Sequence, residues 1–186
     1  MSPAPSWLDT AGHREWLRSR FADVLTFALP SILPGGGFAY QDADGSPMPG
    51  RPPQLFLTAR MAYASSIGVR HGIPGSGELL DHAMESLVGL HADTEHGGWF
   101  TQPGTVTRKA TYDHVHVGLA SANALMVGHP LAVGLLEQVI EVIRPAIQAD
   151  NGDVILHDVD ESTGVVTVEL IGACVPCAAS TVTLQA

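Results

Sequence analysis

Basic residues and cysteines are scarce in this chain of 186 residues. Nine Lys and Arg residues, with Lys109 the only lysine, stand against nineteen Asp and Glu, for a formal net charge of -10. The basic residues form no cluster, and phosphate neutralisation supplies most of the affinity for nucleic acid, so we expect no nucleic-acid partner. Two cysteines are too few for a disulfide framework.

Long apolar runs are also missing. Residues 1–6 contain no basic region followed by an apolar stretch, and no later segment has the uninterrupted apolar length of a membrane span. We therefore expect a cytoplasmic protein that does not contact a membrane. The hydrophobic content of 45% is enough for a packed core, in one domain of ordinary size or two small ones.

Several common ligand motifs are absent as well. The run Gly35–Gly37 lacks a preceding strand and a following Lys-Ser/Thr pair, so it does not predict a phosphate loop. The histidines of the middle region form no HExxH pattern. On one helix His114 and His116 would point about 200° apart, which argues against a shared metal ion.

Apolar periodicity predicts a helix-rich chain with a short hairpin around residues 99–107. The expected helices cover residues 7–27, 55–69, 78–90 and 109–127, and a further helix follows Pro130. Ser6 and Asp9 have the spacing of a capping box for the first helix. Pro145 is expected to kink or shorten the last helix, because proline removes a backbone donor.

The chain changes character near residue 130. From Leu131 onward there are eight acidic residues and one basic residue, Arg144. After Asn151 the pattern changes from helical to alternating, which predicts two strands around a polar turn at residues 160–164. We therefore predict two parts, residues 1–130 and residues 131–186.

The two cysteines, Cys174 and Cys177, form a CxxC motif directly after the second predicted strand. Two thiolates at this spacing can hold a soft metal or one edge of an iron-sulfur cluster, but a cluster usually needs about four ligands. The other ligands would have to come from a second copy of the chain or from a partner protein. A redox pair, half of a zinc site and two inert residues are the alternatives.

The C-terminal part resembles the C-terminal domain of the NifU family of iron-sulfur scaffold and carrier proteins. The resemblance rests on Val142–Asp150, Gly152–Val154, the predicted hairpin, Gly172–Cys177 and Ser180–Thr181. It implies that Cys174 and Cys177 share an iron-sulfur cluster, [4Fe-4S] in type, with the same pair of a second copy. Apo iron-sulfur proteins would receive the cluster. The family's closing helix and last strand would follow Ala186, so we expect a domain truncated at its C-terminus.

The N-terminal part resembles the N-acylglucosamine 2-epimerase family, which includes mannose isomerases. The segments that carry the resemblance are Gly36–Ala39, Leu57–Met61, His96–Phe100, and Lys109 with Tyr112–His114. The resemblance implies part of an (α/α)6 barrel in which Arg60 and Tyr112 bind the substrate. The acid/base histidines of that family belong to later helices, which this chain is not expected to contain.

Without the resemblance, Arg60 is interpreted as a partner in a structural salt bridge. Asp113 and His114 offer an acid/base pair, although an exposed ion pair or a turn contact is the simpler interpretation. Trp99 and Phe100 are interpreted as core residues rather than a sugar platform, and His157 as a solvated residue.

Together these patterns predict an α+β protein: an N-terminal helical array like part of an (α/α)6 barrel, followed by a small truncated α-β-β domain of NifU type. The main functional prediction is cluster assembly and transfer by a carrier rather than an enzyme. The alternative is a fragment of a sugar epimerase or isomerase without activity, because no acid/base pair for proton transfer is found.

Overall fold

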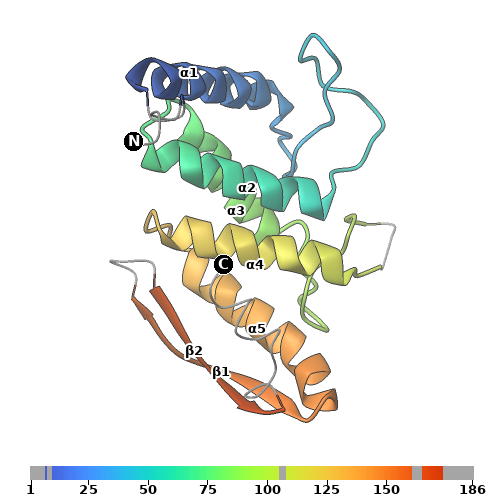
Figure 1. Ribbon diagram of the computed structural model, residues 1–186. Helices are drawn as coiled ribbons and strands as arrows, with labels where there is room; N and C mark the ends of the chain where they lie inside the picture. Colours follow the sequence, from blue (N-terminus) through green and yellow to red (C-terminus); the bar gives the residue numbers. More distant parts are fainter. Residues whose placement is uncertain (1–6, 8–9, 105–107, 161–164, 174–186) are drawn as a thin grey trace, which may run out of the picture.

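The computed structural model describes residues 7, 10–104, 108–160 and 165–173. Within these ranges the chain forms five α-helices, one short 3-10 helix and a two-stranded sheet (Figure 1). The helices are α1 (Ala11–Ala28), η2 (Leu29–Ser31), α2 (Leu55–Arg70), α3 (Ser76–Val88), α4 (Thr111–Leu125) and α5 (Ala132–Ala149). The strands are β1 (Gly152–Asp160) and β2 (Val165–Gly172). The prediction of a helix-rich chain with a small sheet is confirmed.

Helix α1 begins four residues later than its periodicity predicts. Thr10 is its N-cap, and the Thr10 side chain accepts a hydrogen bond from the His13 amide. A threonine oxygen at this position satisfies one of the free N–H groups of the first turn. Ser6, which the capping-box prediction used, lies outside the described residues. Leu25 is the one residue of α1 that is fully buried, so only a small part of this helix packs against the rest of the described structure.

Helix α2 lies between α3 and α4 and forms the centre of the helical array (Figure 1). Its buried side is made of small residues, among them Ala59 and Ala62, which let the neighbouring helices approach closely. The predicted third helix begins two residues earlier than expected and ends two residues earlier, at Val88. The core of these helices also takes in Trp99, which has no exposed surface, and this confirms the prediction for Trp99.

Helix α5 packs against α4 through the fully buried side chains of Ala132 and Leu135. Pro145 lies inside α5, and the helix continues to Ala149. The prediction that this proline shortens the helix is therefore wrong. Proline in a helix interior removes one hydrogen bond, and the helix continues past that position. The expected kink stays a prediction.

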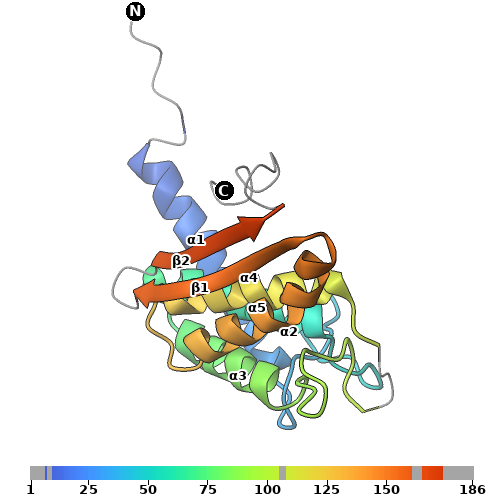
Figure 2. The same cartoon turned by 90° about the horizontal axis from the view of Figure 1, so that it is seen from below.

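Strands β1 and β2 form an antiparallel hairpin, as the alternating pattern predicts, with Gly152 opposite Gly172 and Asp160 opposite Val165. A register shift lies between Leu156 and Asp158. Strand β1 packs against α5, and the hairpin lies on the side of the molecule opposite to α3 (Figure 2). Half-buried valines of both strands, Val159 and Val166, contact the helical core.

The helices and the hairpin thus share one hydrophobic core, and a separate NifU-like domain is not apparent in the described ranges. The domain boundary at residue 130 stays a prediction. None of the helices in the described ranges has the length and apolar character that crossing a membrane requires. The cytoplasmic location likewise stays a prediction.

Candidate functional site

Arg60 and Tyr112, the two predicted substrate-binding residues, meet on the exposed face shared by α2 and α4. The Arg60 Nη2 donates a hydrogen bond of 2.6 Å to the Tyr112 hydroxyl oxygen. The guanidinium carbon also lies 5.5 Å from the ring centre of Phe56 and 5.9 Å from that of Tyr112, within cation-π range. The interpretation of Arg60 as half of a salt bridge is wrong, since its partners are a hydroxyl and two rings.

The cluster forms because helical spacing aligns its members. Phe56 lies one turn before Arg60 on α2, and Tyr112 begins the exposed face of α4. Side chains four residues apart lie on the same helix face. Tyr112 is 56% exposed, so this cluster holds an arginine and a hydroxyl at the surface rather than in the core.

His116 completes the cluster and was not predicted as part of it. Its ring lies 4.6 Å from the Tyr112 ring, edge to face, and both ring nitrogens are buried without a hydrogen-bond partner in the described part of the chain. Burial, and then the positive charge of Arg60, lowers the pKa of His116. The ring is therefore neutral at pH 7. The i, i+4 spacing from Tyr112 was the signal in the sequence that could have revealed it.

Asp113 and His114 are buried, and neither forms the exposed pair that the sequence suggested. Asp113 accepts a hydrogen bond of 2.6 Å from the Thr101 hydroxyl. The Trp99 amide donates to His114 Nε2, and His114 Nδ1 lies 2.8 Å from the Ala110 carbonyl oxygen. Because an amide can only donate and a carbonyl can only accept, His114 is neutral with its proton on Nδ1. Both residues serve to hold the 98–101 loop on α4.

An ion pair between Lys109 and Asp93 holds the residues just before this loop. Lys109 Nζ lies 2.6 Å from a carboxylate oxygen of Asp93, whose other oxygen accepts from the Glu95 and His96 amides. The hydrogen bond from Lys109 and those from the amides lower the pKa of Asp93 to about 2. Lys109 therefore has a structural partner. Asp93 was not singled out from the sequence.

His91 lies in the core behind this loop. Its Nε2 is 3.2 Å from the Thr58 hydroxyl and its Nδ1 is 3.4 Å from the Phe100 carbonyl oxygen. Burial lowers its pKa to about 4. His91 and His114 thus have both ring nitrogens occupied by structural partners, which leaves no ring nitrogen of either residue for proton transfer at the α2–α4 face.

The remaining predicted site residues, Cys174 and Cys177, lie outside the described residues. The described part of the chain contains no group of three or more His, Cys, Asp or Glu side chains that could hold a metal ion. His157, predicted as solvated, pairs with Glu169 across the hairpin at 2.6 Å.

Comparison with known proteins finds a family whose model covers most of the chain. The family model of N-acylglucosamine 2-epimerase (GlcNAc 2-epimerase) matches residues 36–166. The chain is 37% identical to the D-mannose isomerase of Thermobifida fusca over 143 residues, which are 74% of this chain and 35% of that protein. It is 36% identical to the D-mannose isomerase of Pseudomonas cannabina pv. alisalensis, covering 36% of it. The chain therefore spans about a third of the length of these curated relatives.

The fold agrees with solved structures of the same kind. A crystal structure of D-mannose isomerase superposes with a TM-score of 0.61 at 19% identity, over 76% of this chain and 37% of that chain. The cellobiose 2-epimerase of Spirochaeta thermophila gives a TM-score of 0.57 at 23% identity. At these identities the likeness concerns the fold, an (α/α)6 type, of which this chain has a part.

The resemblance to NifU proteins is also found, over a shorter stretch. A NifU-like protein of Schizosaccharomyces pombe is 42% identical over 67 residues, which are 36% of this chain and 26% of that protein. The prediction that the chain is primarily an iron-sulfur carrier is nevertheless wrong. The epimerase match reaches residue 166, and the helix and hairpin assigned to the carrier domain pack onto the helical core.

Proposed function

This chain belongs to the N-acylglucosamine 2-epimerase family, and on that premise we propose that its α2–α4 face binds a hexose of the mannose type. The observation that carries the proposal is the hydrogen bond of 2.6 Å between Arg60 and Tyr112, which joins two helices at an exposed surface. Two curated relatives that match about three quarters of this chain are named D-mannose isomerases. D-Mannose is therefore the ligand we assign to the face.

Polar and aromatic groups lie together on this face, as sugar-binding sites require. A hexose has hydroxyl groups around its edge and weakly apolar C–H surfaces, so its sites combine fixed hydrogen-bond donors with aromatic rings. Arg60 offers the donors that its bond to Tyr112 leaves free, and Phe56 and Tyr112 offer rings. The chemistry of the cluster thus fits the proposed ligand.

The hydrogen bond between Arg60 and Tyr112 leaves both residues able to donate a hydrogen bond to a sugar oxygen. The Tyr112 oxygen accepts from Arg60, so its own O–H stays available to donate. A hydroxyl that already accepts a charge-assisted bond is a stronger donor, because neighbouring hydrogen bonds polarise each other. Isomerisation of an aldose develops negative charge on the carbonyl oxygen, and a guanidinium beside it stabilises that charge.

Proton transfer at the carbon beside the carbonyl also needs a base within hydrogen-bond reach. In the described ranges, His91 and His114 use both ring nitrogens for structure, and those of His116 are buried. The proposal is accordingly that this chain binds the sugar and supplies oxygen-binding groups. It does not assign the base.

The test is a titration of the full chain with D-mannose, followed by saturation-transfer NMR of the sugar protons. We expect saturable binding that Arg60→Met weakens by about tenfold or more, since a hydrogen bond to a charged group contributes about 1.5 to 3 kcal/mol. Tyr112→Phe, which keeps the ring, should weaken binding less.

Arg51→Met is the matched control. Arg51 is exposed and its guanidinium carbon lies 5.1 Å from the Tyr40 ring centre, a similar cation-π pair outside the α2–α4 face, so this variant should bind like the wild type. Equal binding by wild type and Arg60→Met would overturn the assignment. N-Acetylglucosamine in the same titration tests the sugar class, and a preference for it would replace mannose by an acylated amino sugar.

A further inference from the structure

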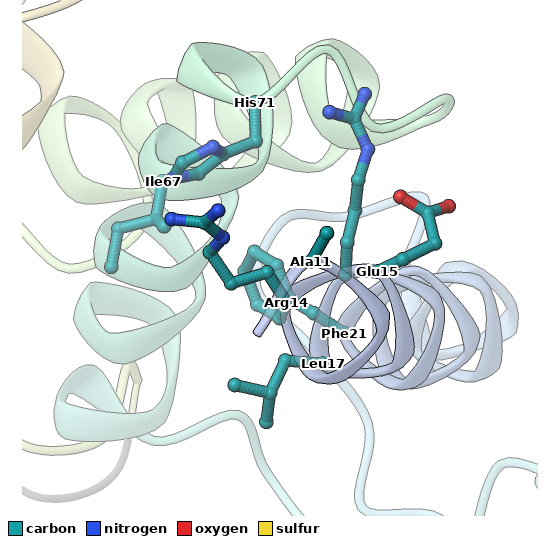
Figure 3. A pocket seen from close by; sticks show the side chains of 8 residues that line it. Ala11, Arg14, Glu15, Leu17, Phe21, Ile67 and His71 are labelled. Carbon is teal, nitrogen blue, oxygen red and sulfur yellow. The ribbon is translucent and has the colours of Figure 1, made fainter. Parts of the chain in front are cut away.

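A second surface lies between α1 and the C-terminal end of α2, away from Arg60. Here the two helices enclose an open groove with a volume of 660 Å³ (Figure 3). Ile67 and His71 of α2 face the side chains of α1 across it. The lining residues from helix α1 are Ala11, Arg14, Glu15, Leu17, Arg18 and Phe21.

The charged groups of this groove have no partner among the residues that the structure describes. Arg14 and Arg18 are exposed, and neither side chain makes an ion pair or hydrogen bond with any residue in the described ranges. His71 is likewise exposed, with a ring that has no partner there. The groove therefore holds the permanent positive charges of Arg14 and Arg18 and the carboxylate of Glu15, in a chain whose formal net charge is -10. A local excess of positive charge in an acidic protein attracts anions.

The spacing of the two arginines suits one anionic group. Residues four apart on a helix have Cβ atoms about 5 to 6 Å from each other on one face. Two guanidinium groups at this spacing can hold a phosphate or a carboxylate between them, and guanidinium geometry matches both anions. The first turn of α1, which starts at Ala11 in the groove wall, adds the positive end of the helix dipole.

Apolar walls accompany these charges. Phe21 and Ile67 are half-buried and line the groove from opposite helices. A free inorganic anion would make no use of these walls, whereas an apolar body attached to the anion would cover them. The volume lies in the range typical of small-molecule sites, about 300 to 1,000 Å³.

We propose that the α1–α2 groove binds a small organic anion, a phosphate or carboxylate joined to a flat apolar body. Arg14 and Arg18 hold the anionic group, and Phe21 and Ile67 hold the apolar body. Arg60 is not among the lining residues, so this site is independent of the proposed sugar face. Binding at either site does not require the other.

The test uses isothermal titration calorimetry of the full chain with phenyl phosphate as the probe. We expect saturable binding of phenyl phosphate with one site per chain. Phenol, which lacks the phosphate group, and inorganic phosphate, which lacks the ring, should each bind more weakly by about tenfold or more. Binding should also weaken as salt is raised, because exposed charges are screened. A phosphate and a carboxylate source are distinguished by repeating the titration with benzoate.

Two variants and one control complete the experiment. Arg14→Gln and Arg18→Gln should each weaken phenyl phosphate binding by about tenfold, because a charge-assisted contact is lost. Arg20→Gln is the matched control, since Arg20 lies on the same helix but pairs with Asp23 and does not line the groove. Circular dichroism of all three checks that they fold.

Three results would overturn the proposal. The first is no saturable binding of phenyl phosphate. The second is equal loss of affinity in Arg20→Gln and Arg18→Gln. The third is heat that changes with protein concentration in the absence of the probe, which would make a second copy of the chain the occupant of the groove. Failure of the sugar titration leaves this result unaffected.

Discussion

At the residue scale, Gly98 joins the loop before α4 to the core. Its φ is +76°, and a Cβ atom placed there would lie 2.7 Å from His114 Nε2, the atom that accepts the Trp99 amide. An alanine would therefore meet both an unfavourable backbone conformation and a clash with a buried ring.

We predict that Gly98→Ala lowers the free energy of unfolding by about 2 to 4 kcal/mol, as left-handed strain and overpacking each cost about 1 to 3 kcal/mol. Gly97→Ala is the control, because Gly97 has a similar φ of +73° and open space around its Cβ position. It should lose about 1 kcal/mol. Urea denaturation of both variants measures the difference, and equal losses would show that the contact with His114 is unimportant.

His91 gives the protein a pH dependence between pH 4 and pH 6.5. Its pKa falls from an ordinary value of 6.5 to about 4, because burial disfavours the charged ring. The unfolded chain takes up a proton below pH 6.5 and the folded chain does not until about pH 4. The stabilising contribution is therefore complete above pH 6.5 and is lost as the pH falls towards 4.

We predict that His91→Gln, which keeps a polar group for Thr58, removes roughly 3 kcal/mol from the fall in unfolding free energy over this interval. Urea denaturation at several pH values measures the slope. If the unfolding free energy of His91→Gln changed with pH as steeply as that of the wild type, a group other than His91 would cause the pH dependence.

The same loop shows which residues the sequence could place. Trp99 was correctly assigned to the core because a large apolar side chain is seldom exposed. The burial of Asp113 and His114 was missed, because it depends on the loop at residues 98–101 folding back onto α4. Their partners, Thr101 and the Trp99 amide, come from that loop, and residue type alone does not reveal such long-range pairing.

At the element scale, the close contact of α2 and α3 depends on one small residue. A Cβ atom at Gly68 would lie 2.3 Å from the Ser76 hydroxyl oxygen and 2.6 Å from a Leu25 methyl carbon. Three elements therefore meet at a position where only hydrogen fits. Ridges and grooves of packed helices tolerate such added volume poorly.

We predict that Gly68→Ala lowers the thermal unfolding midpoint, with a loss of about 1 to 3 kcal/mol, despite the better helix propensity of alanine. Gly134→Ala on α5 is the control, because nothing lies within 4 Å of its Cβ position. That variant should gain about 1 kcal/mol from propensity alone. A gain in both variants would mean that α2 and α3 pack less closely than described.

Helix positions were predictable because apolar periodicity is local, and α2 starts at Leu55 as predicted. The start of α1 was not, since Ser6 and Thr10 are both suitable caps and packing selects between them. Pro145 was expected to kink or shorten α5, and of these alternatives the shortening is wrong. Contacts of α5 with α4 and β1 outweigh the single hydrogen bond that proline removes.

At the scale of the whole molecule, the sequence gives two resemblances and the structure gives one helical core. The strands assigned to a second domain contact this core through Val159 and Val166. The segments that resemble NifU proteins, with the CxxC motif among them, drew the functional prediction towards a carrier. Its residues, Cys174 and Cys177, are outside the described ranges, whereas the family match covers residues 36–166.

Arg60 and Tyr112 were placed by resemblance, and their contact could not have been predicted from spacing, because 52 residues separate them. The array of α2 and α4 brings them together. Their bond to each other, the rings beside them and the neutral His116 make up the surface that the central claim concerns.

The most direct test of that claim is a titration of the isotope-labelled full chain with D-mannose, followed by amide and side-chain chemical shifts. We predict that saturating changes concentrate on α2 and α4 around Arg60 and Tyr112, and that the amides of α1 around Arg14 and Arg18 stay unchanged. No saturating change, or changes confined to α1 or the hairpin, would contradict the sugar-binding account.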